Sequence, residues 1–170
     1  MVRRSDVGEA QDVHPANKRP VGERLARWAL GTVYGRPGEY AGPLFESVQV
    51  EGAAARIRFR HTGSGLATTD HLPPRGFAIA GADREFKWAQ AEIERDTVLV
   101  HHPDVTQPVA VRYAWADNPD CNLGNREGLP AAPFRTDDWD VLQGVTRAPG
   151  PPGPGRPSGS PGPGAGRSAR

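Results

Sequence analysis

The chain has 170 residues and a mass of 18.2 kDa, which is enough for one modest domain with appendages. Hydrophobic residues make up 36% of it, and the formal net charge is +1 at pH 7. Without the last 23 residues, 18 basic side chains face 20 acidic ones, a net charge of −2. The body of the chain therefore has no basic excess of the kind that nucleic-acid-binding proteins show.

The sequence also contains few signals for disulfides, membranes or export. Cys121 is the single cysteine, so an intrachain disulfide is excluded. No apolar run approaches the length of a membrane span. Arg3 and Arg4 are not followed by an apolar stretch, so no secretory signal is visible. We therefore expect neither membrane nor nucleic acid as a partner, and the sequence assigns no compartment.

Residues 17–35 are predicted to form one amphipathic helix. Pro20 suits the first turn, where a missing N–H costs nothing, and Gly35 followed by Pro37 is a stop signal. The apolar face consists of Val21, Leu25, Trp28, Ala29 and Val33. A helix with such a face needs a partner surface.

After a linker at residues 38–43, the apolar period changes from helical to two. Strands are predicted at residues 45–50, 56–61, 76–80, 86–93, 97–101 and 109–115. Short strands with turn signals between them predict a mainly β fold, an antiparallel, jelly-roll-like β-sandwich. The predicted inward set is Val48, Val50, Ile57, Phe59, Phe77, Ile79, Phe86, Trp88, Ile93, Val98, Val100, Val109, Val111 and Tyr113.

Two segments follow the predicted strands. Residues 116–139 form a long polar loop that contains Leu129, Phe134 and Trp139, so we expect it to pack back onto the domain. The same loop can serve as a structural clasp or reach a catalytic cleft. Residues 148–170 hold seven Pro and seven Gly and are expected to be a disordered tail.

Histidines and tryptophans suggest two further kinds of site. His101 and His102 precede Asp104, but adjacent strand residues point to opposite faces, so surface histidines are favoured over a metal site. Trp88, Trp115 and Trp139 are read either as core residues, which is favoured, or as a platform on which sugars stack.

The run Asp12-Val13-His14-Pro15 lies just before the predicted helix. A histidine can act as the general base on a serine, and a carboxylate can orient it. In an extended segment, residues two apart face the same side, so Asp12 can serve His14. The alternative is that His14 is a solvent-exposed histidine without a catalytic role.

Several ordered blocks over residues 6–139 resemble the sialate O-acetylesterase family of SGNH-type esterases. They are the run from Asp12 to Lys18, Tyr40-Ala41-Gly42-Pro43, His61-Thr62-Gly63-Ser64-Gly65-Leu66, Gly76-Phe77-Ala78-Ile79-Ala80, and the region from Val111 to Asp137.

The resemblance implies an enzyme that hydrolyses O-acetyl esters of sialic acid or related acetylated sugars without a metal or other cofactor. It makes His14 the catalytic histidine and Asp12 the candidate orienter. It also implies an SGNH-type α/β domain followed by a β-sandwich, in a family that is often secreted or periplasmic. The division expected is residues 1–37 as the end of the esterase domain, 38–147 as the β-sandwich and 148–170 as the tail.

The Gly-Asp-Ser block of such esterases is missing here. Ser64 lies between glycines in a β-type segment, without the strand-to-helix elbow that exposes a nucleophile. The chain is therefore interpreted as the C-terminal part of an esterase, inactive alone and completed by an N-terminal catalytic domain. Two alternatives stay open: a non-catalytic carbohydrate-binding or structural β-sandwich module, and one part of a split enzyme.

Overall fold

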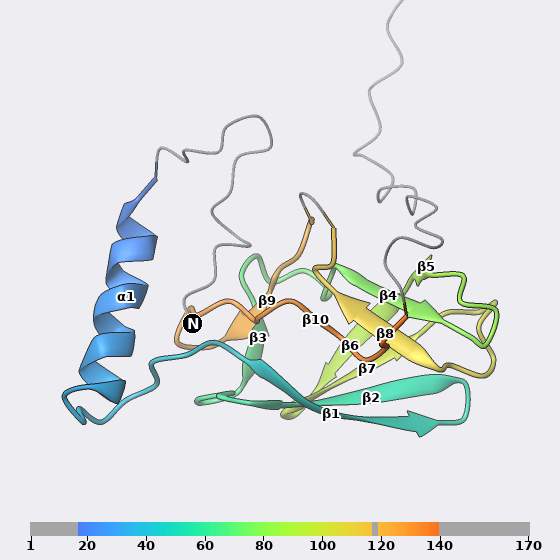
Figure 1. Ribbon diagram of the computed structural model, residues 1–170, viewed down its shortest axis with the longest axis horizontal. Coiled ribbons are helices and arrows are strands. Elements are labelled where there is room, and N and C mark those ends of the chain that lie inside the picture. Colours follow the sequence, from blue (N-terminus) through green and yellow to red (C-terminus); the bar gives the residue numbers. More distant parts are fainter. Residues whose placement is uncertain (1–16, 117–118, 140–170) are drawn as a thin grey trace, which may run out of the picture.

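A computed structural model of the chain describes residues 17–116 and 119–139 (Figure 1). Helix α1 (Arg19–Thr32) precedes a domain built of strands. Within the described residues the strands are β1 (Leu44–Glu51), β2 (Ala54–Arg60), β3 (Leu66–Thr68), β4 (Phe77–Ala80), β5 (Lys87–Trp88), β6 (Gln90–Glu94), β7 (Thr97–His101), β8 (Ala110–Tyr113), β9 (Leu123–Asn125) and β10 (Phe134–Arg135). The predicted tail at 148–170 lies outside the described residues.

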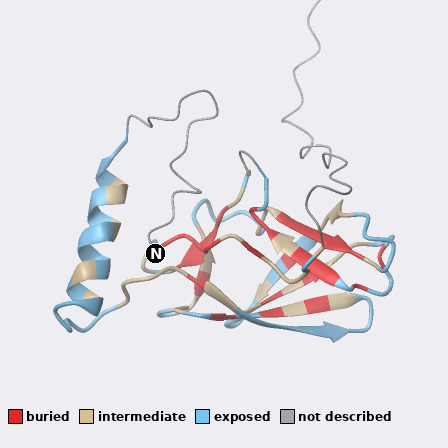
Figure 2. Cartoon of the chain, in the orientation of Figure 1, coloured by how far each residue is buried: buried red, intermediate tan, exposed pale blue. Residues whose placement is uncertain are grey.

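The strands form two four-stranded sheets, with orders β1-β2-β7-β6 and β10-β8-β4-β5, and a small sheet of β3 and β9. Each strand pair is antiparallel. The two larger sheets enclose a single apolar core, as the red segments of Figure 2 show. The predicted mainly β, antiparallel fold with one helix is confirmed. In the described part of the chain, no helix is long and apolar enough to cross a membrane.

The core follows the alternation of the strands. Ile57, Val98 and Val100 of the first sheet are fully buried against Ile79 and Val111 of the second. Successive strand residues point to opposite faces, so the polar residues between them reach solvent. The predicted inward positions of these residues are confirmed.

Three members of the predicted inward set are exposed, so the burial predicted for them is wrong. Val48 pairs with Ile57 and so lies on the core face, yet it is 38% exposed. Val50 on the same face is 53% exposed. Strand β1 is the edge of its sheet, and the opposing sheet does not cover this edge. Val109 is 56% exposed because it lies ahead of β8.

The predicted strand at 86–93 is two strands in different sheets. Strand β5 pairs with β4, and β6 pairs with β7, so the chain passes from one sheet to the other at Ala89. Trp88 pairs with Ala78, whose neighbours Phe77 and Ile79 face the core. The predicted inward position of Trp88 is therefore wrong, because its side chain shares the outer face of the sheet with Ala78.

Phe86 is also on the outer face. Its ring lies beneath the Arg112 guanidinium, at 4.0 Å from ring centroid to guanidinium carbon. Arg112 pairs with Ala78 and so belongs to the same outer row. The predicted inward position of Phe86 is wrong for the same reason as that of Trp88: the chain changes sheets between residues 88 and 90.

The segment predicted as a long loop contains β9 and β10 and is largely buried. Leu123, Leu129 and Phe134 are each less than 8% exposed. Phe134 stacks on Phe45 at a centroid distance of 4.8 Å and also contacts Phe59, Phe77 and Tyr113. The expectation that this segment packs back onto the domain is confirmed, and its strands β9 and β10 were missed because each is only two or three residues long.

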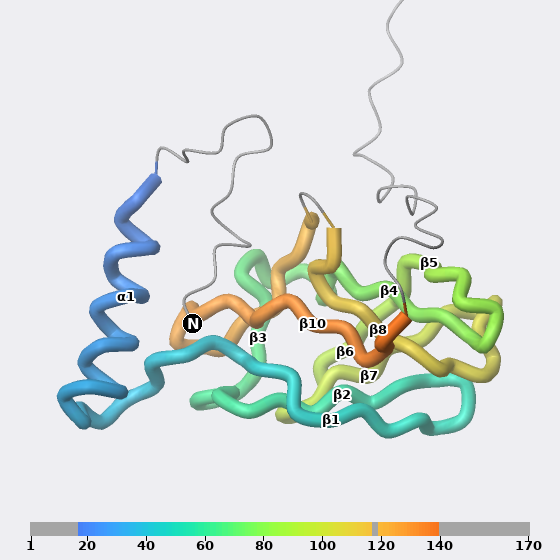
Figure 3. The backbone as a smooth tube through the Cα atoms, in the orientation of Figure 1, coloured from blue at the N-terminus to red at the C-terminus, as the bar shows by residue number. Residues whose placement is uncertain are grey.

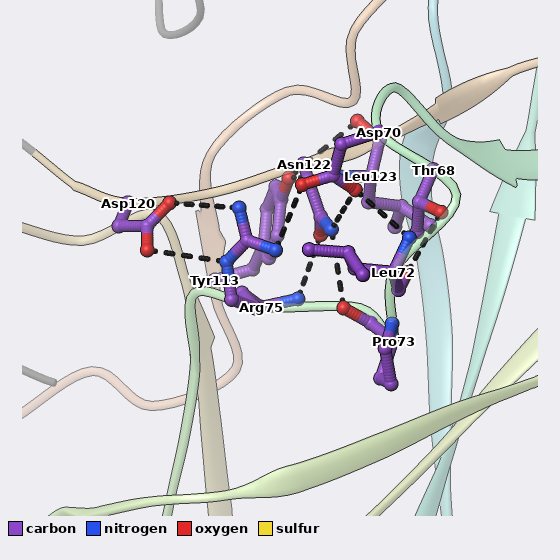
Figure 4. A network of polar contacts seen from close by, with 9 residues as sticks. All are labelled: Thr68, Asp70, Leu72, Pro73, Arg75, Tyr113, Asp120, Asn122 and Leu123. Atoms are coloured by element: carbon purple, nitrogen blue, oxygen red, sulfur yellow. Dashed lines mark hydrogen bonds and ion pairs between the residues drawn. The ribbon is translucent and has the colours of Figure 1, made fainter. Parts of the chain in front are cut away.

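A polar network fixes the segment that leads into β9 (Figure 4). Asn122 is 3% exposed and its side-chain amide donates to Asp70 at 2.8 Å and to the Pro73 carbonyl at 3.1 Å. The Arg75 guanidinium bridges Asp70 and Asp120. Buried polar groups are stable only when their hydrogen bonds are satisfied, and here the loops at 68–75 and 120–123 satisfy each other.

We expect Ile57→Ala and Val50→Ala to differ sharply, although both residues lie on the core face of neighbouring strands. Removing the buried Ile57 side chain leaves a cavity and lowers the free energy of unfolding by about 2–5 kcal/mol. Val50→Ala removes an exposed side chain and should change the free energy of unfolding by no more than about 0.5 kcal/mol. Urea unfolding of both variants measures the difference, and equal losses would show that the edge of β1 is covered in solution.

We expect Asp70 to make stability dependent on acid pH. The hydrogen bond from Asn122, followed by those from Leu72 and Arg75, lowers the pKa of Asp70 to about 2. Its stabilisation is therefore complete above the unfolded pKa of about 4 and is lost as the pH falls through about 2. Asp70→Asn is expected to be less stable than the parent at pH 7.

Urea midpoints between pH 7 and pH 2 test this prediction. The parent and Asp70→Asn should converge as the pH approaches 2, because protonation then removes the same charge from the parent. Asp96→Asn, at the exposed turn between β6 and β7, has the same change of charge and serves as the control. A constant gap between parent and Asp70→Asn across the range would contradict the assignment.

Candidate functional site

The predicted catalytic pair, Asp12 and His14, lies outside the described residues. The described chain begins at residue 17, and the N-cap of α1 is Lys18, four residues after His14. Pro20 occupies the first turn of the helix, as predicted. Helix α1 is thus the described element nearest to the histidine along the chain.

A groove of about 330 Å³ lies between α1 and the β domain. It is lined by Arg24, Trp28, Thr32, Tyr40, Ala41, Gly42, Leu44, His61, Leu129, Pro130 and Ala132. The helix supplies part of this lining, and the linker and the segment after β9 supply most of the rest. Figure 3 shows the paths of these backbone segments. Aromatic, cationic and small apolar side chains therefore meet in one concave surface.

The linker is held by an imidazole–carboxylate pair. The His61 Nδ1–H donates to Glu39 Oε1 at 2.8 Å, and the Tyr40 ring meets the His61 ring edge-on at a centroid distance of 5.4 Å. His61 adopts a φ of +59°, an uncommon conformation for a residue other than glycine. The turn after β2 thus presents the imidazole to the linker.

Asn125 joins three segments beneath the groove. Its side chain is 4% exposed and donates to the carbonyls of Ala41 and His61, at 3.2 and 3.3 Å. Its Oδ1 accepts the N–H of Leu129 at 2.9 Å. Gly42 packs so closely on Pro130 that a side chain at position 42 would collide with the backbone. The linker is therefore fixed tightly to the β domain.

The helix itself is fixed less tightly. The Arg27 guanidinium donates to the Glu127 carbonyl at 3.2 Å, and Gly31 lies against the Tyr40 ring. None of the residues of α1 is buried, and Leu25 and Val33 are 52% and 68% exposed. The apolar face predicted for this helix is present, and the described part of the chain covers little of it.

Ser64 makes its hydrogen bond to Glu127 and not to His61, the histidine of the same turn. Its backbone N–H donates to Glu127 Oε1 at 2.9 Å. Hydrogen bonds from the Ser64 hydroxyl and backbone lower the pKa of Glu127. Gly63 and Gly65, on either side, have positive φ angles. This arrangement clasps the turn after β2 to the turn after β9.

His102, which follows β7, has a local partner. The backbone N–H of Asp104 donates to His102 Nδ1 at 3.1 Å, so that nitrogen is occupied. Residues 17–116 and 119–139 contain no group of three or more His, Cys, Asp or Glu side chains arranged to hold a metal ion.

The groove and the His61–Glu39 pair were missed by the sequence analysis. His61 belongs to a quoted family block, but its neighbours in the sequence have no ligand spacing. Its carboxylate partner is 22 residues earlier in the chain, beyond a strand hairpin. The sequence offered one signal: the family blocks at 40–43 and 61–66 contain Tyr40 and His61, whose rings meet at this contact.

Comparison with solved structures gives a likeness that bears on function. The chain is similar to the crystal structure of a carbohydrate acetylesterase from Xanthomonas citri, with a TM-score of 0.76 and 46% sequence identity. The match covers 79% of this chain and 31% of the other. No family model matches the chain, and the search of curated proteins returned no match.

This likeness supports the relation to carbohydrate esterases expected from the sequence. At this level of identity it extends beyond a shared fold. The chain spans about a third of the length of the Xanthomonas citri enzyme, so the activity of that whole protein does not transfer directly. The narrower resemblance to sialate O-acetylesterases stays a prediction.

We expect α1 to exchange its amide hydrogens faster than strands β7 and β8 in the isolated chain. Local protection follows buried contacts, which the strands have and the helix lacks. Hydrogen exchange followed by mass spectrometry measures this. Equal protection of helix and strands would show that α1 has a firm partner within the chain, and an independent β-sandwich module would then be the better interpretation.

Proposed function

We propose that this chain is part of a carbohydrate acetylesterase and acts on O-acetyl esters of sugars, sialic acid or related acetylated sugars among them. The observation that carries the proposal is the 46% identity, over 79% of the chain, to the Xanthomonas citri carbohydrate acetylesterase. The ordered sequence blocks that surround the groove support it.

In the proposed mechanism His14 is the general base. It takes the proton of a serine hydroxyl as the serine attacks the acetyl carbonyl, and it returns a proton to the sugar oxygen as the ester bond breaks. Asp12 holds the imidazole in the tautomer that accepts this proton. Water then attacks the acetyl-serine with His14 as the base, and acetate leaves as the serine oxygen regains its proton.

The serine is proposed to come from a domain that docks on α1 and the groove. Leu25, Trp28 and Val33 expose an apolar face beside the groove, and an exposed amphipathic helix gains stability by covering such a face. Because α1 follows His14 by only a few residues, the same contact brings the histidine to the serine. Residues 1–37 would then belong to the esterase domain and 38–147 to its β-sandwich.

A chimera tests the proposal directly. This chain replaces the matching third of the Xanthomonas citri enzyme, and hydrolysis of a chromogenic acetate ester is measured. We expect an active chimera, whereas the isolated chain should not exceed the background rate. His14→Ala in the chimera should lower kcat by roughly 10⁴- to 10⁶-fold, because the members of a triad act as a unit.

Matched variants separate chemistry from folding. Asp12→Asn should reduce kcat less than His14→Ala, since the orienting residue of a triad contributes less than its base. His71→Ala changes an exposed histidine of the β domain and should leave kcat within about twofold of the parent chimera. Full activity of the His14→Ala chimera would refute the proposed mechanism.

A further inference from the structure

The outer face of the sheet β10-β8-β4-β5 carries a row of large side chains. The register places Arg135 opposite Arg112, Arg112 opposite Ala78, and Ala78 opposite Trp88. Directly paired residues of antiparallel strands share one face, so these four residues cross the sheet from edge to edge. In Figure 1 this sheet lies at the end of the molecule away from α1.

Three aromatic rings extend this row, each in contact with a guanidinium. Arg112 lies 4.0 Å over Phe86, Arg84 lies 5.3 Å over Trp139, and Arg135 lies 5.5 Å over Trp115. Phe86 and Trp139 pack on each other at a centroid distance of 5.6 Å. We call the surface formed by Phe86, Trp88, Arg112, Trp115, Arg135 and Trp139 the arginine–tryptophan face.

The polar groups of this face are held in place. Arg112 makes two hydrogen bonds, of 2.8 and 2.7 Å, to Asp137, whose side chain is 1% exposed. Burial disfavours the charged carboxylate, but Arg112 outweighs it and the pKa of Asp137 is lowered. Arg135 donates to the Trp139 carbonyl at 3.2 Å. A surface fixed in this way loses little conformational entropy when it binds a ligand.

The chemistry of the face fits a sugar chain. A pyranose ring has an apolar C–H side that packs on an indole and hydroxyls that accept hydrogen bonds from guanidinium groups. Trp115 is 45% exposed, so one ring is open to such a contact. Asp137 lies against both Arg112 and Arg135. Glu85 and Asp138, next to Phe86 and Trp139 in the sequence, bring the acids of these segments to three, against the three arginines Arg84, Arg112 and Arg135, which favours a neutral chain over a polyanion.

We propose that the arginine–tryptophan face binds a neutral polysaccharide chain, with Trp115 as the exposed stacking residue. The face would hold the polymer that bears the acetyl groups. Binding is measured without hydrolysis, so its failure would leave the proposed esterase function untouched.

Native gel electrophoresis of the full chain tests this proposal. The gels contain O-acetylated glucomannan, arabinoxylan or hydroxyethylcellulose, three soluble neutral polysaccharides, and the retardation gives the affinity. We expect retardation of the parent by at least one of them and a loss of roughly three- to tenfold in affinity for Trp115→Ala, the size of one aromatic contact. Trp115→Phe should lie between the two.

Two further variants provide a control and a second test of the face. Tyr34→Ala removes an aromatic ring that is 72% exposed next to α1, and it should bind as the parent does. Arg135→Gln leaves the Trp115 ring in place but removes its guanidinium neighbour, and it should also weaken binding, which decides the matter if Trp115→Ala fails to fold. A fourth gel contains the polyanion polygalacturonate. The proposal is overturned if none of the three neutral polysaccharides retards the parent, including the case in which polygalacturonate alone does. It is also overturned if Trp115→Ala and Arg135→Gln both bind as the parent does.

Discussion

Phe134 is the contact on which the β domain depends. Its ring touches Phe45 and Phe59 of one sheet and Phe77 and Tyr113 of the other, at centroid distances between 4.8 and 6.4 Å. Two sheets form a sandwich only when their inner faces share one dry core. Here the side chain that joins them comes from the last short strand of the described chain, so the segment after β8 completes the domain.

The same segment connects the core to the groove. On its way from β8 to Phe134 it passes through Asn122, which the loop before β4 holds, and Asn125, which holds the linker. Ala132 then donates its N–H to the Pro43 carbonyl. The position of the linker, and through it the end of α1, therefore rests on hydrogen bonds made by a part of the chain about 90 residues later.

The two ends of the molecule differ in character. Near α1 the surface is apolar and only partly covered by the described residues, with exposed Leu25 and Val33, as the proposed contact with another domain requires. At the other end, rings and guanidinium groups alternate, and Asp137 ties them together. The proposed contact with a catalytic domain and the proposed sugar-binding face thus lie at the two ends of the molecule, with the Phe134 core between them.

The sequence alone determined the helix, the antiparallel fold and most of the core, because periods of 3.6 and two are local properties that Ile57, Val98 and Val111 obey. It also singled out Asp12 and His14, through residues adjacent in the chain. Only the tertiary structure decided which strand is an edge, which exposes Val48 and Val50, and where the chain changes sheets, which turns Phe86 and Trp88 outward. It alone brought Glu39 to His61 and Arg135 to Trp115, since contacts between residues 20 or more positions apart depend on strand order and register, which no local pattern encodes.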